Sequence, residues 1–176
     1  FADLDRDGRE DAVVGNGHVL RHVERLRPAW SFAQADVALR ALPGGTFGPW
    51  ALGEGLDVPR VTRGMACGDL DGDGFLDFYL GTGDPEYASI MPNLMLLGRG
   101  GERFVDVTMA GGFGHLQKGH AIAFADLDQD GDVDVFEQMG GAYIGDRYRD
   151  LLFENPGFGN RWIRVSCRGP RARRSG

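Results

Sequence analysis

Three copies of one short pattern constrain the fold of this chain more than any other feature. Aspartate stands at positions 1, 3, 5 and 9 of a nine-residue segment, and glycine stands at position 6. The copies span residues 3–11, 69–77 and 126–134. Four like charges in so short a segment repel one another unless a cation lies among them. The glycine permits the left-handed backbone of a tight turn.

The pattern predicts calcium binding. Calcium takes about six to eight oxygen ligands at ~2.3–2.6 Å, and alternate carboxylates with one main-chain carbonyl from position 7 supply such a set. One Asp-rich turn alone is often only solvated, but three copies with the same spacing indicate dedicated metal loops. We expect about three Ca²⁺ ions, one in each loop. The expected ligands are Asp3, Asp5, Asp7, Arg9 and Asp11, then Asp69, Asp71, Asp73, Phe75 and Asp77, then Asp126, Asp128, Asp130, Asp132 and Asp134.

Composition narrows the class of partner. The formal net charge of the 176 residues is -7, and the loop aspartates make up a large share of the 26 acidic residues. The acidity is therefore local, and the balance argues against nucleic acid as a partner. No apolar run reaches the roughly 18 residues that a membrane-spanning helix needs. Cys67 and Cys167 are too far apart in sequence to indicate a zinc site or a disulfide framework, so we expect small buried side chains.

The repeat extends beyond the loops. A shift of 57 residues carries the second loop onto the third, and it also aligns the segments that precede them. The first and second loops are 66 residues apart, so nine additional residues must lie between Asp11 and Asp36. We place them in the poorly patterned stretch 21–34. The aligned positions are Asp36 with Asn93 and Asp150, Gly44 with Gly101, and Phe47 with Phe104.

The segments around the loops predict short β-strands. Apolar or alternating runs bounded by glycine occur at 65–67, 75–80, 93–97, 103–108, 121–125 and 133–136. Four short strands per repeat, with the metal loop in the first hairpin, are typical of a β-propeller blade. Stacking such sheets buries faces that a lone sheet would expose. We expect an all-β propeller of about three four-stranded blades over residues 1–154, and missing blades supplied by the rest of a longer parent chain.

These residues resemble a known family. The triplicated D-x-D-x-D-G-x-x-D loop, the Phe47-Gly48 and Phe113-Gly114 pairs and the strand that begins at Asn93 are similar to the FG-GAP/VCBS repeats of calcium-binding propellers. Residues 155–176 look like the start of a truncated ASPIC/UnbV domain, a combination similar to bacterial cartilage-acidic-protein-like proteins. The resemblance implies an extracellular, periplasmic or cell-surface location. It also implies a non-enzymatic, adhesion-like role in which a rigid surface binds protein or glycan.

An EF-hand is the main rival interpretation of the third loop. Glu137 occupies the twelfth position, where an EF-hand requires a bidentate acid. The first and second loops carry Val14 and Leu80 there, and their flanks are short and β-like. We therefore expect Glu137 to be a strand residue that faces solvent, and the alternative is that its side chain reaches the metal.

An enzyme is the alternative from another class. The sequence contains no fingerprint of a serine hydrolase, zinc peptidase or nucleotide-binding loop. His115, Lys118 and His120 are the main candidates for chemistry, either as polar loop residues or as residues lining one face of a propeller. The alternative is then a secreted enzyme in which calcium is structural.

Aromatic and basic residues complete the expectations. We assign the aromatic residues mainly to the cores of the blades, namely Trp30, Phe47, Trp50, Phe75, Phe78, Tyr79, Phe104, Phe124, Phe136 and Phe153. A basic C-terminal end, interpreted as a solvated strand face or as contact with an anionic partner, comprises Arg161, Arg164, Arg168, Arg171, Arg173 and Arg174.

Overall fold

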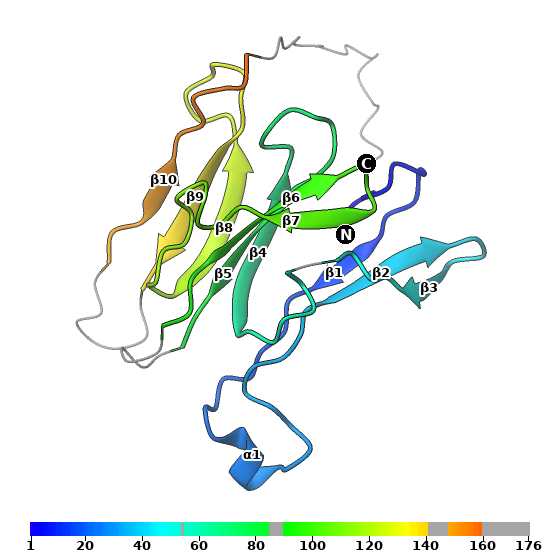
Figure 1. The fold of residues 1–176 in the computed structure, drawn as a ribbon, viewed down its shortest axis with the longest axis vertical. Coiled ribbons are helices and arrows are strands. Elements are labelled where there is room, and N and C mark those ends of the chain that lie inside the picture. The colour runs from blue at the N-terminus through cyan, green and yellow to red at the C-terminus, as the bar shows by residue number, and fades with distance from the viewer. Residues whose placement is uncertain (54, 85–89, 141–147, 160–176) are drawn as a thin grey trace, which may run out of the picture.

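The computed structural model describes residues 1–53, 55–84, 90–140 and 148–159, and within them the regular secondary structure is almost entirely β (Figure 1). One short helix interrupts ten strands. The elements are β1 Ala12–Val14, α1 Val23–Leu26, β2 Val37–Leu42, β3 Thr46–Pro49, β4 Thr62–Gly68, β5 Asp77–Thr82, β6 Leu94–Arg99, β7 Arg103–Asp106, β8 Gly119–Ala125, β9 Asp134–Met139 and β10 Leu151–Phe153.

The strands form three antiparallel sheets. The first has the order β1-β2-β3, the second β4-β5-β6-β7 and the third β10-β9-β8, so strands that follow one another in sequence pair with one another. The expectation of four strands per sheet holds for the second sheet. Within the described residues the other two sheets have three strands each.

The 57-residue period is a structural repeat. Asp36, Asn93 and Asp150 stand immediately before β2, β6 and β10. Each of their side chains accepts a hydrogen bond from a backbone N–H that follows or ends the preceding strand. The pairs are Asn16 N to Asp36 Oδ1 at 2.6 Å, Thr82 N to Asn93 Oδ1 at 2.8 Å and Met139 N to Asp150 Oδ1 at 3.2 Å.

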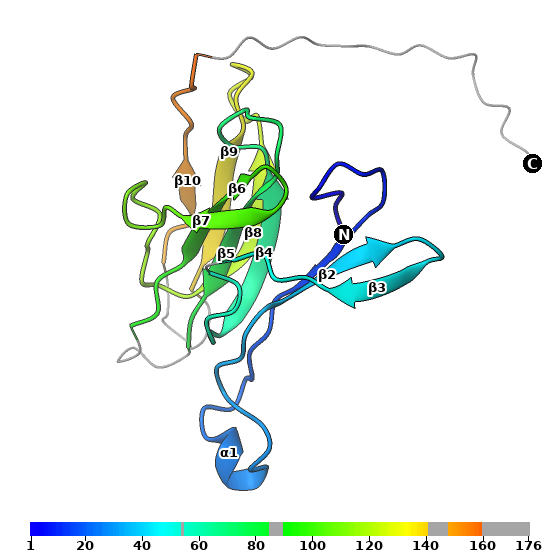
Figure 2. The same cartoon turned by 45° about the vertical axis from the view of Figure 1, so that its right-hand side comes forward.

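The second sheet lies between the other two, and its strand β5 is buried on both faces (Figure 2). Side chains alternate across a strand. Phe78 and Leu80 therefore pack in a cluster that includes Leu4 and Ala38 of the first repeat. Tyr79 faces the opposite way, into a cluster with Val135 of the third sheet. Stacking thus buries both faces of this sheet, as the sequence predicted.

The second and third sheets approach each other closely where glycines occur. A β-carbon on Gly64 of β4 would lie far inside van der Waals contact with the carbonyl oxygen of His120 in β8. A β-carbon on Gly81 of β5 would lie 2.9 Å from the carbonyl carbon of Gly119. These positions need glycine because backbone, rather than a movable side chain, fills the space.

The predicted core assignment of the aromatic residues is confirmed for most of those whose burial is described. Phe78, Tyr79 and Phe104 are buried, and others pack against the two clusters. The assignment is wrong for Trp30, which is 52% exposed, and for Phe47, which is 47% exposed. Trp30 belongs to the long connection around α1, at the bottom of Figure 1, where the nine additional residues were expected. Phe47 lies on β3, the outer strand of the first sheet.

Cys67 is only partly buried and packs against the core cluster as a free thiol. The expectation that it is a buried apolar residue is therefore met in part, and Cys167 lies outside the described residues. The described helix is too short and too polar to cross a membrane.

Candidate metal centre

The Asp-rich segments occupy equivalent places in the fold. Residues 3–11 (loop 1) lead into β1, residues 69–77 (loop 2) join β4 to β5, and residues 126–134 (loop 3) join β8 to β9. Loops 2 and 3 therefore connect the first two strands of their sheets, as the sequence predicted. Strands flank them on both sides, which removes the EF-hand interpretation, because that motif requires helices.

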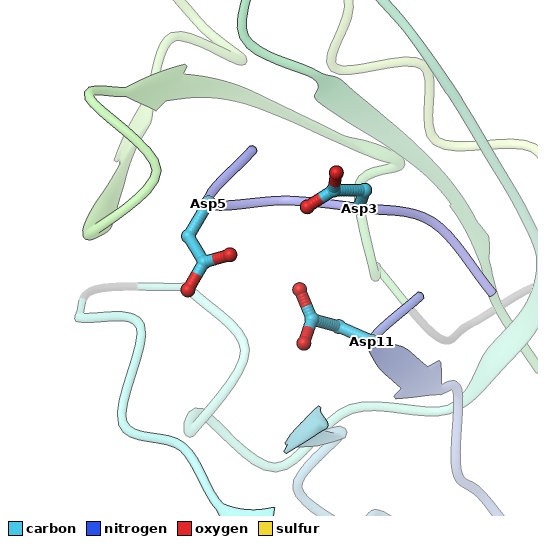
Figure 3. A group of neighbouring side chains, drawn as sticks. All are labelled: Asp3, Asp5 and Asp11. Carbon is cyan, nitrogen blue, oxygen red and sulfur yellow. The ribbon is translucent and has the colours of Figure 1, made fainter. Parts of the chain in front are cut away.

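Each loop brings three carboxylates together. In loop 1, Asp3, Asp5 and Asp11 point toward one common space (Figure 3). In every group, one oxygen of each member lies within 4.8 Å of the others. Loops 1 and 2 gather positions 1, 3 and 9, whereas loop 3 gathers positions 1, 3 and 5 and is exposed. The other two groups are Asp69 with Asp71 and Asp77, and Asp126 with Asp128 and Asp130.

Several residues predicted as ligands lie outside these groups. The predicted ligands outside the groups are Asp7, Asp73, Asp132 and Asp134, together with Arg9 and Phe75, whose main-chain carbonyls were expected to bind at position 7. Both oxygens of Asp134 accept backbone N–H groups, as those of Asp11 and Asp77 also do. The sequence pattern identified which segments gather acids, but not which oxygens meet.

The backbone of the loops confirms the left-handed glycine at position 6, where φ is +87° at Gly8, +90° at Gly74 and +102° at Gly131. Position 4 is also left-handed, which the sequence analysis missed. Its residues are Arg6 with φ 61°, Gly72 with φ 68° and Gln129 with φ 67°. Only loop 2 has glycine there, so no shared residue type marks the position.

The left-handed position 4 supports a paired prediction. Gly72→Ala should lower the free energy of unfolding by about 1–2 kcal/mol, because an L side chain is strained at positive φ. Gln129→Gly should change it by less, in the stabilising direction, because the relief of strain is partly offset by the greater freedom of glycine in the unfolded chain. Urea unfolding of both variants in the presence of a chelator measures the two effects. Equal losses in both variants would contradict this reading of position 4.

The loops hold their shape with their own carboxylates. The backbone N–H of position 5 donates to the carboxylate at position 3, and the N–H of position 7 donates to the carboxylate at position 5, in all three copies. In loops 1 and 2 the glycine N–H also donates to position 1, at 2.9 Å in both. These bonds fix the direction of the side chains before any ligand is considered.

Position 9 has a second role that the sequence analysis did not find. Asp11, Asp77 and Asp134 are almost completely buried, and each joins its loop to another part of its own sheet. One carboxylate oxygen accepts the N–H of position 2, from Leu4 at 3.0 Å, Leu70 at 2.7 Å and Leu127 at 2.9 Å. The other accepts an N–H from residues that are 57 apart, Ala41 at 2.8 Å, Gly98 at 2.8 Å and Asn155 at 2.9 Å.

Burial affects two acids of loop 2, Asp77 and Asp69. Burial raises the pKa of Asp77 to about 6; the N–H groups of Leu70 and Gly98 oppose this shift, and the nearby charges of Asp71 and Asp69 reinforce it. Asp69 also has one oxygen, Oδ1, that is buried and has no hydrogen-bond partner within the described residues. An oxygen in that state is unfavourable unless a cation or a donor satisfies it.

Arginines provide part of the charge compensation. Nη1 of Arg99, at the end of β6, lies 2.7 Å from Asp71 Oδ2 and 3.0 Å from Asp73 Oδ2. Arg40 forms an ion pair with Asp5, and Arg9 with Asp7. From the sequence, metal ions alone were expected to compensate this charge. Arg40 and Arg99 come from other strands, so their positions depend on the tertiary fold.

Loops 1 and 2 also touch each other. The guanidinium of Arg6 lies 5.0 Å from the ring centroid of Phe75, a cation–π contact. The hairpin that joins β6 to β7 packs on loop 1, because a β-carbon on Gly101 would lie 2.7 Å from the Cα of Asp5.

The predicted candidates for chemistry are only partly loop residues. His115 lies in a loop, and its Nδ1 accepts the N–H of Gln117 at 3.0 Å. Lys118 is buried directly before β8, and His120 is part of β8. The interpretation as polar loop residues is therefore wrong for His120, whereas Lys118 is a loop residue that is buried.

Glu137 does not face solvent. Its side chain is fully buried, and its two carboxyl oxygens form hydrogen bonds with the hydroxyl of Tyr79 and with the side-chain amide of Asn93. The prediction was wrong because the strand pattern was assigned to the wrong face. Val135, Glu137 and Met139 are buried and alternate along β9, so Glu137 points with them into the protein.

The C-terminal segment is described only as far as residue 159. Asn155 is buried, and its side-chain amide donates to the carbonyl of Leu70 at 2.8 Å and to that of Val133 at 3.2 Å. Asn155 therefore ties loop 2 to the end of loop 3. The arginines of the predicted basic end all lie outside the described residues.

Comparison with protein families agrees with the repeat. Residues 69–137 match the family model of the FG-GAP-like repeat. This segment runs from the first aspartate of loop 2 to Glu137 and includes all of loop 3. It covers less than half of the chain. No curated protein matches the sequence.

Proposed function

We propose that this chain is part of a calcium-binding β-propeller of the FG-GAP/VCBS type, and that its three Asp-rich loops hold structural Ca²⁺. The observation that carries the proposal is the convergence of three carboxylates in each loop, with positions 1 and 3 taking part in all three. The matched FG-GAP-like repeat contains two of the loops.

The donor set fits calcium. All candidate ligands are oxygens, which favours hard cations such as calcium and magnesium over zinc or copper. Calcium accepts irregular oxygen shells, whereas magnesium requires near-ideal octahedral geometry. In loop 2, Asp69, Asp71 and Asp77 would hold the ion, and the buried unpartnered Oδ1 of Asp69 would gain a partner. A bound ion supplies positive charge in the middle of each loop.

Residues of the chain itself support and orient the ligands. The aspartate at position 9 ties each loop to its sheet, so the ligands stand on a rigid support. The bonds within the loop aim the carboxylates at positions 1 and 3 toward the same space. We propose that an ion there rigidifies the hairpin and the loops around it.

The three sheets are consistent with consecutive propeller blades. The second sheet is covered by the first on one side and by the third on the other. We propose that the stacked sheets present a rigid surface that binds protein or glycan in an extracellular, periplasmic or cell-surface location. Millimolar calcium outside cells suits extracellular modules with a Kd of ~10⁻⁴–10⁻³ M.

Calcium titration tests the proposal. We expect calorimetry to detect about one Ca²⁺ per loop. We also expect each occupied loop to raise the free energy of unfolding by about 1.4 kcal/mol at a free calcium concentration about ten times Kd, because calcium binds the folded state alone. Thermal unfolding in calcium and in a chelator measures the effect, with magnesium as the ionic control.

Two variants localise the effect. Asp71→Asn should weaken binding at loop 2, because one charged ligand is lost from it. Asp57→Asn removes the same charge at an exposed position outside the loops and should bind calcium as the unmodified chain does. The proposal would be wrong if neither heat of binding nor a change in melting temperature appeared on adding calcium.

A further inference from the structure

A buried acid joins the second and third sheets at a point away from the calcium loops. Glu137 lies on β9 of the third sheet and has 0% relative exposure. Its carboxylate meets Tyr79 of β5 and Asn93 before β6, both of the second sheet. These contacts make it a side-chain link between two sheets that share no backbone pairing in the described residues.

The hydrogen bonds of this link need one more hydrogen than an ionised acid provides. The hydroxyl oxygen of Tyr79 lies 3.0 Å from the carbonyl oxygen of Phe113 and 2.9 Å from Oε2 of Glu137. A hydroxyl has one hydrogen and can donate to only one of these two acceptors. The amide of Asn93 donates to Oε1 of Glu137 at 2.7 Å, so it does not supply the missing hydrogen.

We propose that Glu137 is a neutral carboxylic acid in the folded protein, that its proton completes the link between the second and third sheets, and that losing this proton weakens the contact between them. The acid then donates from Oε2 to the hydroxyl of Tyr79, and Tyr79 donates to the carbonyl of Phe113. Every acceptor in the chain of bonds is satisfied, and no charge is buried.

The surroundings of Glu137 favour the neutral form. The hydrogen-bond partners that the structure gives its carboxylate are neutral, and burying an unpaired charge is costly. Burial raises the pKa of Glu137 to about 7, and the bonds from Tyr79 and Asn93 lower it only in part. Burial and the carboxylate beside it also raise the pKa of Tyr79, so Tyr79 keeps its hydrogen.

The groups on neighbouring elements are also known. On β8, Gly119 packs directly against Oε1 of Glu137, and a β-carbon there would overlap this oxygen. Leu151 of β10 pairs with Glu137 through the backbone. The titratable and charged residues adjacent in sequence to these contacts are Lys118, His120 and Asp150. His115 is also near, because its main-chain carbonyl accepts the N–H of Asn93.

The direction of the pH effect follows from linkage. The folded state binds the proton of Glu137 more tightly than the unfolded state, whose pKa is near 4.5. Stability from this group is therefore complete at acidic pH and is lost as pH rises toward and through about 7. Between pH 5 and pH 8 the equilibrium constant for folding should fall roughly 50-fold or more through this one group.

Glu137→Gln tests the proposal. Glutamine has the shape of the neutral acid, because its carbonyl can accept from Asn93 and its amide can donate to Tyr79. We expect the glutamine variant of the 176-residue chain to be about as stable as the unmodified chain at pH 5 and clearly more stable at pH 8. Urea unfolding across this pH range, with a chelator throughout, measures the difference. Because no calcium is present, the result does not depend on the proposed function.

Two further measurements identify the protonated group and the part of the fold that it affects. Infrared difference spectra at pH 5.5 should show the carbonyl band of a protonated carboxylic acid that is absent from Glu137→Gln. Protection factors for amide exchange in β5, β8 and β9, corrected for the intrinsic rise of exchange with pH, should fall above pH 7 in the unmodified chain and not in the variant. Subtracting the pH profile of the variant removes the contributions of the histidines, which both proteins share. Identical profiles for the two proteins, or a glutamine variant that is less stable at every pH, would overturn the proposal.

Discussion

Replacing Asp77 with alanine is expected to lower the free energy of unfolding by about 3–5 kcal/mol even when no calcium is present. The carboxylate is fully buried and accepts the N–H groups of Leu70 and Gly98. Alanine leaves both donors buried without a partner, and each unsatisfied group costs about 1–3 kcal/mol. Urea unfolding in a chelator measures the loss, because it removes any contribution from a bound ion.

Asp73→Ala is the matched control for this prediction. Asp73 is in the same loop and carries the same charge, but it is exposed and accepts the N–H of Phe75 near the surface. We expect its replacement to cost about 1 kcal/mol or less in the absence of calcium. If Asp77→Ala lowered the free energy of unfolding as little as Asp73→Ala, the conclusion that position 9 stabilises the fold by joining its loop to the sheet would be wrong.

Gly64→Ala is expected to lower the free energy of unfolding by about 3 kcal/mol or more, or to prevent folding. The added methyl group would overlap the carbonyl oxygen of His120, and two packed strands would have to separate to admit it. Overpacking costs about 1–3 kcal/mol where side chains can move, and here the obstacle is backbone. Thermal and urea unfolding report the effect.

Gly48→Ala provides the comparison for Gly64→Ala. Gly48 is also a strand residue, on β3, and an added β-carbon would meet only the end of the Leu42 side chain at 3.1 Å. Leu42 is 40% exposed and can move aside. We expect a change within about 0.5 kcal/mol. A similar loss at both glycines would show that the strand propensity of alanine, and not the contact between sheets, sets the loss of stability.

The sequence predicted the local units well because their signals are local. Each Asp-rich loop contains its own turn residues, so the left-handed glycine at position 6 follows from residue type alone. Strands such as β5 and β8 follow from short runs of alternating or apolar residues. The 57-residue period aligned Asp36, Asn93 and Asp150, and the structure gives all three the same hydrogen bond.

The site was only partly predictable for a geometric reason. A spacing of aspartates shows which residues are near one another, but it does not show which oxygens accept backbone N–H groups. Asp11, Asp77 and Asp134 accept equivalent pairs of backbone N–H groups, but only Asp11 and Asp77 lie in the groups of converging acids. Arg99 reaches loop 2 from the end of β6, and nothing in the residues around Asp71 indicates that partner.

The amino-acid sequence by itself determined the loops, the turns and the order of short strands, because each depends on residues within one hairpin. Only the tertiary structure decided which face of each strand is buried and which polar groups meet across sheets. Glu137 shows the difference. Its strand could be recognised from sequence, but its burial results from the stacking of the third sheet on the second, where Gly119 leaves room for the acid and Tyr79 and Asn93 bind it.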